Sequence, residues 1–238
     1  MKIALIGYGK MGKAIEEVAL QRGHEIILKI DVHNASDFTA TNMSLADAAI
    51  EFTGPTSAFE NVMKCLQFRV PVVCGSTGWL KRWNEVKLFC ERENGSLVYA
   101  SNYSVGVNIF FEINQKLAAL MATRPEYDIR LEEIHHTQKK DAPSGTAVSL
   151  AEQVLANNPR KTTWVNEKAL HPDELEIISK REDPAPGTHT VKYYSPIDDI
   201  EIIHTAHNRT GFATGAVIAA EFILGKKGVL GMKDVLGL

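Results

Sequence analysis

The feature that most constrains this chain is a glycine-rich turn between a predicted strand and a predicted helix, close to its start. Residues 2–6 are apolar, residues 7–12 read GYGKMG, and residues 10–21 carry apolar side chains at helical spacing. The pattern G-x-G-x-x-G also occurs by chance in ordinary turns, so its setting decides what it means. Between a strand and a helix, the glycines let the backbone approach a pyrophosphate, and the helix start offers free N–H groups. The turn therefore predicts a dinucleotide site rather than merely a tight connection.

An acidic residue after the second predicted strand supports this interpretation and bears on the choice of cofactor. Asp31 follows the β-rich residues 25–30 and lies about 20 residues beyond the glycine turn, where a carboxylate meets the ribose 2′-hydroxyl of a dinucleotide. The same carboxylate should repel a 2′-phosphate, whereas Lys10 could attract one, and no arginine follows Asp31. We therefore expect NADH to be the preferred cofactor, with NADPH tolerated.

The alternation of predicted strands and helices continues to about residue 103. Strands are expected over residues 48–52, 70–74 and 96–100, and helices over residues 57–67 and 83–93. This alternation predicts a Rossmann-type, doubly wound parallel sheet. Ligands bind beyond the carboxyl ends of the strands in such sheets, so residues 75–78 could pass close to the nicotinamide ribose, although a plain turn would also explain them.

Beyond residue 103 the pattern changes. A helix over residues 108–121, a strand over 127–134 and a helix over 146–155 are followed by three predicted strands with no long helix between them, at residues 176–180, 189–194 and 199–206. This order predicts a mixed or antiparallel sheet. A last apolar helix, residues 216–224, is expected to pack back on the first domain. We therefore predict an α/β domain (residues 1–103 and 210–238) and a smaller α+β domain (residues 104–209).

The overall composition excludes several other classes of protein. The 238 residues are 45% apolar and 23% charged, which excludes a disordered chain, and the net charge of −3 supplies no basic field to attract nucleic acid. The apolar stretches at residues 70–74 and 216–224 are too short to cross a membrane, and too few residues precede the first glycine for a signal peptide. We expect a cytoplasmic protein that binds neither nucleic acid nor membranes.

The cysteines do not indicate a structural or catalytic role. Cys65, Cys74 and Cys90 are an odd number without CxxC spacing, which argues against a disulfide framework and a zinc ribbon. A semialdehyde dehydrogenase shares the nucleotide fold but needs a nucleophilic cysteine, and Cys74 lies in an apolar predicted strand that should keep it a thiol.

Two alternative functions remain open. One is another nicotinamide-dependent dehydrogenase of an amino-acid-derived acid, and the other is a nicotinamide sensor without turnover.

The densest group of chemically active residues lies at residues 133–146, EIHHTQKKDAPSGT. Adjacent histidines on a strand point to opposite faces unless the strand ends there. Lys139 and Lys140 bring positive charge to the following loop, and residues 143–146 are typical of a helix start with free N–H groups. Such a loop suits a small acid with more than one carboxylate, and a histidine could supply a proton near neutral pH. A solvated surface loop is the alternative, and no metal is expected because His135, His136 and Asp141 lack a usual metal spacing.

This segment resembles a family signature. Residues 133–147 match the pattern E-x-H-H-x-x-K-x-D-A-P-S-G-T-A of the 4-hydroxy-tetrahydrodipicolinate reductases, also called dihydrodipicolinate reductases. Residues 47–53 are similar to the family's D-x-x-I-D-F-T, residues 75–78 to its G-T-T-G, residues 100–108 to its A-x-N-F-S-V-G-V-N, and residues 187–190 to its G-x-H-T. The resemblance covers nearly the whole chain.

The resemblance implies a reaction and a set of roles. It implies NAD(P)H-dependent reduction of a dicarboxylate ring to tetrahydrodipicolinate on the route to diaminopimelate and lysine, in a homotetramer assembled through the sheet of the second domain. It implies that His135 donates or accepts a proton and that Lys139 is a second proton donor. The implied carboxylate contacts are His136, Gly145 and Thr146. The expected cofactor contacts are Gly7, Tyr8, Gly9, Lys10, Met11, Gly12, Asp31, Thr53, Gly75, Ser76, Thr77, Ala100, Ser101, Asn102 and Tyr103.

The chain also departs from the family pattern. Many members have the longer glycine turn G-x-G-G-x-M-G, and Ser76 and Tyr103 stand where the family has threonine and phenylalanine. These departures bear on nucleotide preference and loop detail but leave the segment at residues 133–147 intact. Arg209, taken to lie at the end of the predicted strand at residues 200–206, is a candidate for locking a cleft that closes between the domains during turnover, with hinges near Tyr103 and Arg209.

Overall fold

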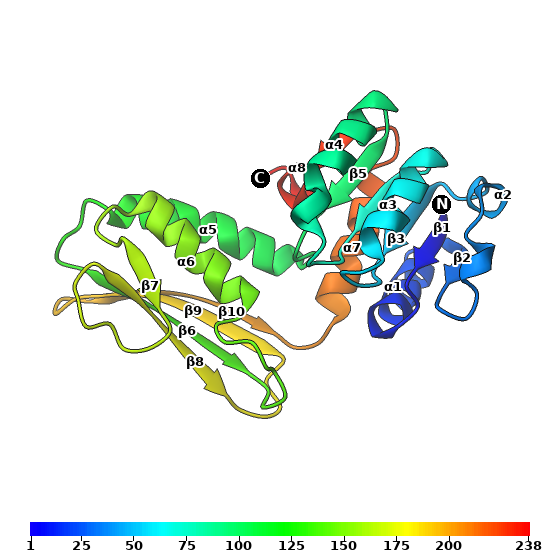
Figure 1. Cartoon of the computed structure of the whole chain (residues 1–238). Helices are drawn as coiled ribbons and strands as arrows, with labels where there is room; N and C mark the ends of the chain where they lie inside the picture. Colours follow the sequence, from blue (N-terminus) through cyan, green and yellow to red (C-terminus); the bar gives the residue numbers. More distant parts are fainter. The chain divides into compact units, whose positions relative to one another are not determined.

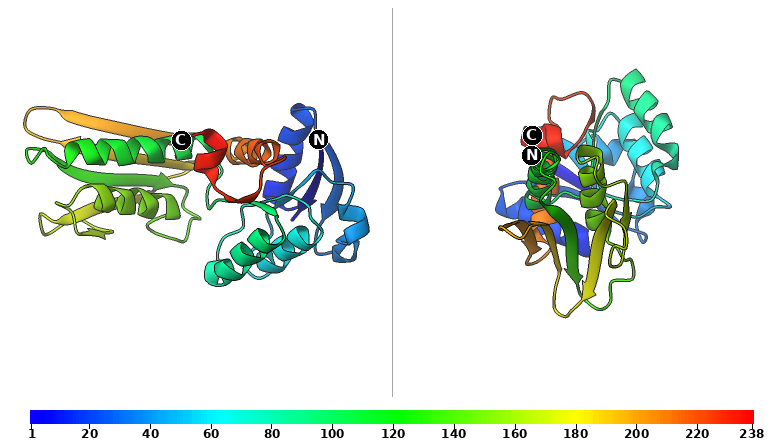
Figure 2. Two further views of the ribbon diagram at one scale, coloured as in Figure 1. Left: turned by 90° about the horizontal axis from the view of Figure 1, so that it is seen from above. Right: turned by 90° about the vertical axis from the view of Figure 1, so that its left-hand side faces the viewer.

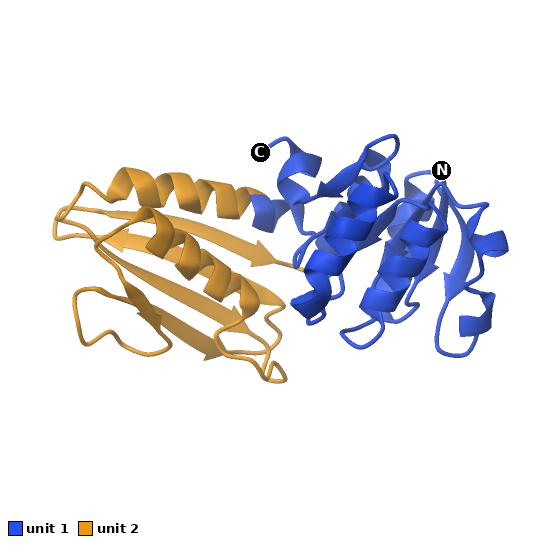
Figure 3. Ribbon diagram, turned by 45° about the horizontal axis from the view of Figure 1, so that its top comes forward, with its two compact units in different colours: residues 1–108, 209–238 blue, residues 109–208 orange.

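The computed structural model describes all residues from 1 to 238 and divides into two compact units. Unit 1 comprises Met1–Asn108 and Arg209–Leu238, and unit 2 comprises Ile109–Asn208 (Figure 3). The sequence-based boundaries at residues 103 and 210 lie within a few residues of this division. No helix has both the length and the apolar character required of a membrane span.

Unit 1 contains a six-stranded sheet in which all neighbouring strands are parallel (Figure 1). Its strand order is β11-β5-β4-β3-β1-β2. The chain runs from β1 to β2 on one side and then returns to β3, β4 and β5 on the other, so a switch point for ligand binding lies between β1 and β3. The strands are β1 (Lys2–Ile6), β2 (Glu25–Ile30), β3 (Ala48–Glu51), β4 (Val72–Cys74), β5 (Ser96–Tyr99) and β11 (Gly228–Leu230).

Both faces of this sheet are buried, which explains the unbroken apolar run of β1. Ile3 and Leu5 pack into the cluster under α1 (Lys10–Gln21) and α7 (Thr210–Phe222), whereas Ala4 and Ile6 pack into the cluster under α3 (Ala58–Gln67) and α4 (Trp83–Arg92). A strand covered on both sides needs apolar residues at every position. The short elements of unit 1 are α2 (Ala40–Met43), α8 (Met232–Leu236) and two 3₁₀ turns, Ala35–Asp37 and Leu80–Arg82.

Unit 2 contains a five-stranded mixed sheet in the order β10-β9-β6-β8-β7. β10, β9 and β6 are antiparallel neighbours, whereas β6, β8 and β7 run parallel. The helices α5 (Val105–Met121) and α6 (Gly145–Asn157) cover one face of this sheet (Figures 1 and 2), where alternate strand residues such as Ile129 and Leu131 form the core. The strands are β6 (Asp128–His135), β7 (Thr163–Val165), β8 (Glu174–Arg181), β9 (Gly187–Tyr194) and β10 (Asp199–Ala206).

The predicted fold class is confirmed: a doubly wound parallel sheet accompanies a second, mixed sheet. Two differences have physical causes. The strands β7 and β11 have only three residues each, too few to show a periodic pattern. The helix predicted from residue 216, α7, begins at Thr210, because its first turns contain Gly211 and Gly215 and therefore look non-helical in sequence. Gly215 has a packing reason, since a Cβ there would lie 1.7 Å from the carbonyl oxygen of Tyr103.

Candidate functional site

Four loops follow the carboxyl ends of neighbouring strands in unit 1 and form one edge of its sheet. They are residues 7–9 after β1, 52–55 after β3, 75–78 after β4 and 100–103 after β5. A cavity of about 430 Å³ lies at this edge. Five predicted cofactor residues line it, namely Gly7, Tyr8, Gly9, Asp31 and Thr53, together with the apolar Val32, Ala35, Phe38 and Phe52 and the polar Asn61 and Lys64.

The three glycines of residues 7–12, two in the loop after β1 and one in the first turn of α1, have different reasons to be glycine. Gly7 has a φ of +94°, and a Cβ there would lie 2.2 Å from the carbonyl oxygen of Phe52. A Cβ at Gly12 would lie 2.3 Å from the carbonyl oxygen of Gly7. Gly9 is different, because it has a negative φ and a Cβ would meet no atom of the protein within 4 Å. Contacts within the protein explain the first and third glycines, whereas no contact within the protein requires glycine at the second position.

The remaining predicted cofactor residues occupy several environments. Lys10 and Met11 lie in the first turn of α1 and do not line the cavity. Ser76 is buried and its hydroxyl accepts a hydrogen bond from the Thr53 N–H at 2.9 Å, which joins two of the loops. Gly75 is close-packed, since a Cβ would lie 2.1 Å from the ring of Phe52. Thr77 and Ser101 are exposed, and Ala100 is half-buried.

Tyr103 is a core residue of unit 1. Its hydroxyl donates hydrogen bonds to the carbonyl oxygens of Cys74, at 2.9 Å, and Val98, at 3.0 Å, and its side chain is 2% exposed. Burial raises the pKa of Tyr103 well above its ordinary value. The hydroxyl that distinguishes it from phenylalanine is therefore used inside the protein, and its main chain is what remains for a ligand. Asn102 is also engaged, since its side-chain oxygen accepts from the Ser104 N–H.

In unit 2 the segment at residues 133–146 joins the end of β6 to the start of α6. β6 ends at His135, as the expectation of a strand end requires, and Ser144 is the N-cap of α6, its hydroxyl accepting from the Ala147 N–H at 3.2 Å. Gly145 and Thr146 form the first turn of α6, and a Cβ at Gly145 would meet nothing within 4 Å. The helix start therefore presents free N–H groups and space beside them.

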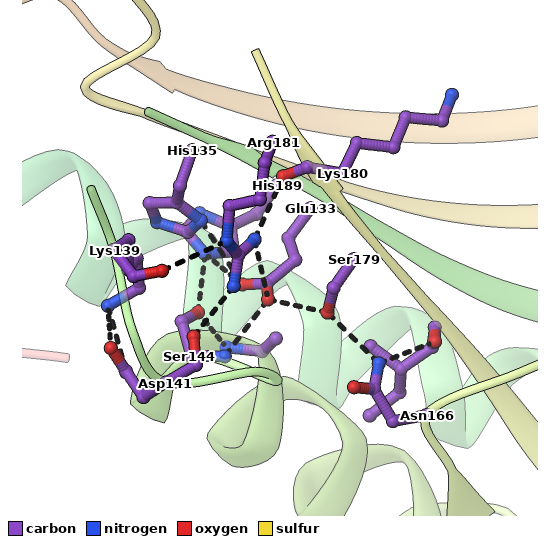
Figure 4. Close-up of polar contacts among 12 residues, drawn as sticks. Glu133, His135, Lys139, Asp141, Ser144, Asn166, Ser179, Lys180, Arg181 and His189 are labelled. Atoms are coloured by element: carbon purple, nitrogen blue, oxygen red, sulfur yellow. Dashed lines mark hydrogen bonds and ion pairs between the residues drawn. The ribbon is translucent and has the colours of Figure 1, made fainter. Parts of the chain in front are cut away.

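Glu133 is a fully buried carboxylate at the centre of this segment (Figure 4). Its Oε1 accepts hydrogen bonds from the Ser144 N–H at 3.0 Å and from the Ser179 hydroxyl at 2.7 Å, and Nη1 of Arg181 lies 3.8 Å from the same oxygen. Burial alone would raise the pKa of Glu133, but the contacts with His189, Ser144 and Ser179 lower it to about 2. Glu133 is therefore ionised throughout the physiological range.

His135 lies next to this carboxylate and is only 7% exposed. Its Nδ1 is 3.4 Å from Oε2 of Glu133, and its ring meets that of His189 edge-on with centroids 5.1 Å apart. Burial lowers the pKa of His135 to about 4, although the Glu133 carboxylate opposes the change. This differs from the expectation of a histidine that titrates near neutral pH, because the sequence does not show how completely the end of β6 is covered. A protonated His135 at neutral pH would need further negative charge, such as the carboxylates of a dicarboxylate.

Lys139 is paired rather than free. Its ammonium group donates to both carboxylate oxygens of Asp141, at 2.9 and 2.8 Å. Arg181 supports the same loop from β8, donating to the carbonyl oxygens of Lys139 at 3.4 Å and of Asp141 at 2.6 Å. His136 is half-buried at the start of the loop, and its carbonyl oxygen accepts from the Lys139 N–H.

The structure brings two residues to this segment that sequence reasoning missed, Arg181 on β8 and His189 on β9. His189 had a partial signal, because it belongs to the matched motif at residues 187–190, whereas Arg181 had none. His189 forms a close group with Glu133 and His135 whose ligand atoms lie within 4.8 Å of one another, while His136 and Asp141 lie outside it. The cationic Arg181 and Lys139 beside this group oppose a divalent ion, so we interpret it as a hydrogen-bonding cluster.

The structure also shows where Arg209 lies. Arg209 is the N-cap of α7 and does not end a strand.

The three cysteines, Cys65, Cys74 and Cys90, are buried free thiols. Burial raises the pKa of the Cys74 thiol well above its ordinary value, and its Sγ donates to Oε2 of Glu51 at 3.1 Å. Burial also raises the pKa values of Cys65 and Cys90, so the thiolate that a semialdehyde dehydrogenase needs is disfavoured at all three positions.

Comparison with known proteins gives a consistent result along the whole chain. Two family models match, "Dihydrodipicolinate reductase, N-terminus" over residues 1–103 and "Dihydrodipicolinate reductase, C-terminus" over residues 106–236. A 4-hydroxy-tetrahydrodipicolinate reductase from Christiangramia forsetii is 48% identical, covering 99% of this chain and 98% of its own. One from Methanoregula boonei is 35% identical, covering 100% and 98%. A solved dipicolinate-bound dihydrodipicolinate reductase from Paenisporosarcina sp. TG-14 has the same fold, with a TM-score of 0.78, 23% identity and 97% coverage of both chains.

Proposed function

The chain belongs to the dihydrodipicolinate reductase family, and from this premise we propose which residues bind the cofactor, bind the substrate and transfer protons. The enzyme is a nicotinamide-dependent 4-hydroxy-tetrahydrodipicolinate reductase of diaminopimelate and lysine biosynthesis. In the proposal, the loops at the carboxyl edge of the unit 1 sheet hold the cofactor, and residues 133–146 of unit 2 hold the dicarboxylate substrate and supply protons.

The cofactor part of the proposal depends on one observation, the open space at Gly9. A glycine that neither φ nor internal packing requires, at the start of α1 and beside a cavity of about 430 Å³, fits the close approach of a pyrophosphate. When bound, the nicotinamide supplies the hydride. The main-chain N–H groups at the start of α1 stabilise the pyrophosphate, and Ser76, tied to Thr53, fixes the neighbouring loop. We propose that the other predicted contacts, at residues 100–103, act through their exposed and main-chain atoms.

We propose that NADH is preferred. Asp31 lines the cavity, and its carboxylate accepts from the Val32 N–H at 2.7 Å, which holds it at the end of β2. A ribose with two free hydroxyls can donate to that carboxylate, whereas a 2′-phosphate would be repelled. Lys10 does not line the cavity. Lys64 is the cation that does, and its ammonium lies 5.2 Å from the centroid of the Phe38 ring.

The substrate part of the proposal follows from the arrangement around α6. The free N–H groups of Gly145 and Thr146 and the half-buried His136 can hold the carboxylates of a small diacid. Hydride addition leaves enamine character at a neighbouring carbon, which must be quenched by an acid. We propose that His135 gives this proton and that Lys139, released from Asp141, is the second donor. The carboxylates of the substrate would raise the pKa of His135 by opposing the cations beside it.

The uncovered face of the unit 2 sheet supports the proposed homotetramer. The helices α5 and α6 cover one face, while the other carries Ile203, which is 58% exposed, and Tyr194, which is 36% exposed. Apolar side chains on an open sheet face suit association with a second copy. We also propose the cytoplasm as the site of action, because it supplies the reduced cofactor and keeps thiols such as the three buried cysteines reduced.

The experiment that tests the assignment generates the unstable substrate in place with the upstream synthase and follows NADH consumption. Oxidation of NADH above the synthase-only control is expected, with a higher kcat/KM for NADH than for NADPH. Absence of oxidation with both cofactors, in a protein that still binds NADH, would instead favour the nicotinamide sensor. Sedimentation of the wild-type protein as a tetramer, and of an Ile203→Glu variant as smaller species, would support the assembly.

A further inference from the structure

Two rows of side chains cross the helix-covered face of the unit 2 sheet at the end of β6. In the first row, Glu133 lies directly opposite Ser179 of β8 and His189 of β9, and His189 lies opposite His204 of β10. In the second row, two residues further along β6, His135 lies opposite Arg181. Residues two apart on a strand share a face, so the buried Glu133 stands beside the proposed proton donor. The proposed function gives Glu133 no role.

The two oxygens of Glu133 have different surroundings (Figure 4). Oε1 accepts from the Ser144 N–H and the Ser179 hydroxyl, at 3.0 and 2.7 Å. Oε2 has no such donor and faces two imidazoles, with Nδ1 of His135 at 3.4 Å and Nε2 of His189 at 3.6 Å. Oε1 is therefore occupied by donors from α6 and β8, and Oε2 is directed to the histidines.

The two ring nitrogens of His135 also have different surroundings. Nδ1 faces the carboxylate, whereas Nε2 lies beside Gly187, where a Cβ would be 3.0 Å from it. An ionised carboxylate only accepts hydrogen bonds, so a neutral ring that meets it must carry its proton on Nδ1. Nε2 is then the nitrogen with a free lone pair, and glycine at position 187 leaves space beside it.

We propose that Glu133 is a positioning residue, which keeps a proton on Nδ1 of His135 so that Nε2 is the atom that exchanges a proton with the substrate. This inference rests on the proposed function. In the protonated ring, Nε2 gives its proton to the enamine carbon left by hydride addition, and the C–H bond forms as the N–H bond breaks. The ring returns to the neutral form with its proton on Nδ1, and water restores the proton at Nε2. Because Glu133 also accepts from the Ser144 N–H, the same carboxylate fixes the start of α6.

The charges around His135 make Glu133 the group that favours its protonated form. The facing groups are Glu133 on its own strand, His189 on β9, Arg181 on β8 and Lys139 in the loop. Burial lowers the pKa of His135, and His189, Lys139 and Arg181 lower it too, whereas the Glu133 carboxylate raises it. Removing the negative charge at position 133 should therefore disfavour the protonated ring.

The variant Glu133→Gln tests this role directly, because the neighbouring donors fix the orientation of its carboxamide group. The Ser144 N–H and the Ser179 hydroxyl require an acceptor at the position of Oε1, so the carboxamide oxygen must lie there and the NH₂ group must face the histidines. Nδ1 of His135 then has to accept, and the proton moves to Nε2. Long-range ¹H–¹⁵N correlation spectra at neutral pH, without substrate, report which nitrogen carries the proton, and the His135→Gln spectrum identifies the signals of His135.

We expect the proton on Nδ1 in the wild-type protein and on Nε2 in Glu133→Gln, with the wild-type form kept in Glu133→Asp. Glu132→Gln is the matched control, since the same change is made one residue earlier, where the side chain pairs with Lys180 at 2.8 Å. In the enzyme assay, kcat of Glu133→Gln should fall at least tenfold, with the KM for NADH unchanged and the pH profile of kcat/KM moved to lower pH. Glu132→Gln should stay within twofold of wild type.

Three results would overturn the inference. The first is a wild-type His135 with its proton on Nε2, which is decisive even if the variants do not fold, and the second is an unchanged proton position in folded Glu133→Gln. Loss of wild-type activity in EDTA that zinc restores would also overturn it, because the cluster would then hold a metal. These results differ from those expected if the proposed function is wrong. In that case the wild-type protein would not oxidise NADH in the assay, but the proton position on His135 would be the same.

Discussion

The two candidate sites are built from different materials. The cofactor edge of unit 1 consists largely of main chain and glycine, and its central feature is the absence of a side chain at Gly9. The segment at residues 133–146 of unit 2 consists of ionisable side chains, with the buried Glu133 surrounded by two histidines, an arginine and two serines. In the proposed function, the cofactor edge binds its ligand through shape and main-chain N–H groups. The segment at residues 133–146 binds its ligand through charged side chains and the positions of their protons.

This difference determines how each site should respond to change. Main-chain N–H groups do not titrate, so the shape of the cofactor edge should be sensitive to added bulk and insensitive to pH. The unit 2 cluster has a histidine and a carboxylate whose pKa values both lie below their ordinary values, so it should be sensitive to charge and acid. The predictions below test this contrast.

The largest effect is expected from removing the proton donors of unit 2. His135→Gln and Lys139→Ala should each lower kcat by about 10²–10⁴, the usual contribution of a positioned acid, because the enamine carbon then lacks its proton source. The dissociation constant of NADH should stay unchanged, since neither residue lies in unit 1. Steady-state kinetics with substrate generated in place, together with NADH fluorescence titration, measure both quantities.

Matched controls exist for both changes. Lys140→Ala removes the exposed lysine next to Lys139, and His171→Gln removes an exposed histidine of the same unit. Both should retain wild-type kcat. Weakened NADH binding in His135→Gln or Lys139→Ala would mean that these residues belong to the cofactor site, and the contrast between the two sites would fail.

The sequence predicted these residues because they are consecutive. The glycine turn, the histidine pair and Lys139 each lie in one short stretch, so spacing and resemblance locate them without knowledge of the sheet. The parallel sheet was predictable for a similar reason, since strands such as β1, apolar at nearly every position, alternate with amphipathic helices.

The partners of these residues were not predictable in the same way. Arg181 and His189 reach Glu133 and His135 only through the pairing of β6 with β8 and β9, and register between strands distant in sequence is not visible in one sequence. The same limit applies to Tyr103, whose hydroxyl finds its two carbonyl partners through the packing of β4 and β5. Burial was the missing quantity at His135: it lowers the pKa of the ring to about 4, so the ring does not titrate near neutral pH as the sequence led us to expect.

The next effect concerns stability toward acid. The folded-state pKa of His135, about 4, lies below the ordinary value of 6.5, so between these pH values the unfolded chain binds more protons and stability falls as the pH falls. Glu133, with its pKa lowered from 4.5 to about 2, stabilises the fold above pH 4.5 and loses that contribution as the pH falls further. From pH 6.5 to 4.5, His135 should cost about 2–3 kcal/mol of unfolding free energy.

Urea unfolding at these two pH values measures this cost. The drop in unfolding free energy should be smaller in His135→Gln than in wild type by about 2–3 kcal/mol, because the variant has no group to protonate on unfolding in that range. His171→Gln should behave as wild type. An equal drop in wild type and His135→Gln would show that His135 is not the source of the acid sensitivity, and would weaken the contrast with unit 1.

Replacing one glycine in each site by alanine tests whether added bulk affects the two sites separately. A Cβ at Gly9 and one at Gly145 both meet nothing within 4 Å, so alanine at either position should fold with an unchanged Tm. Gly9→Ala should raise the dissociation constant of NADH roughly ten- to a hundredfold, since a small displacement of a bound group has effects of this size. Gly145→Ala should raise the KM for the dicarboxylate and leave NADH binding unaltered. The same loss of NADH binding in both variants would contradict the division of roles.

The smallest effect concerns the choice between the two nicotinamide cofactors, the one place where the cofactor edge depends on charge. Asp31→Ser keeps an acceptor for the Val32 N–H and removes the carboxylate, so kcat/KM for NADH should fall about tenfold, equivalent to about 1.4 kcal/mol, while that for NADPH rises. Lys64→Met tests the remaining cation of the cavity and should lower kcat/KM for NADPH alone if its ammonium meets the 2′-phosphate. A wild-type enzyme with a higher kcat/KM for NADPH than for NADH would contradict the role given to Asp31, because it would show that Lys64 outweighs the carboxylate in the same cavity.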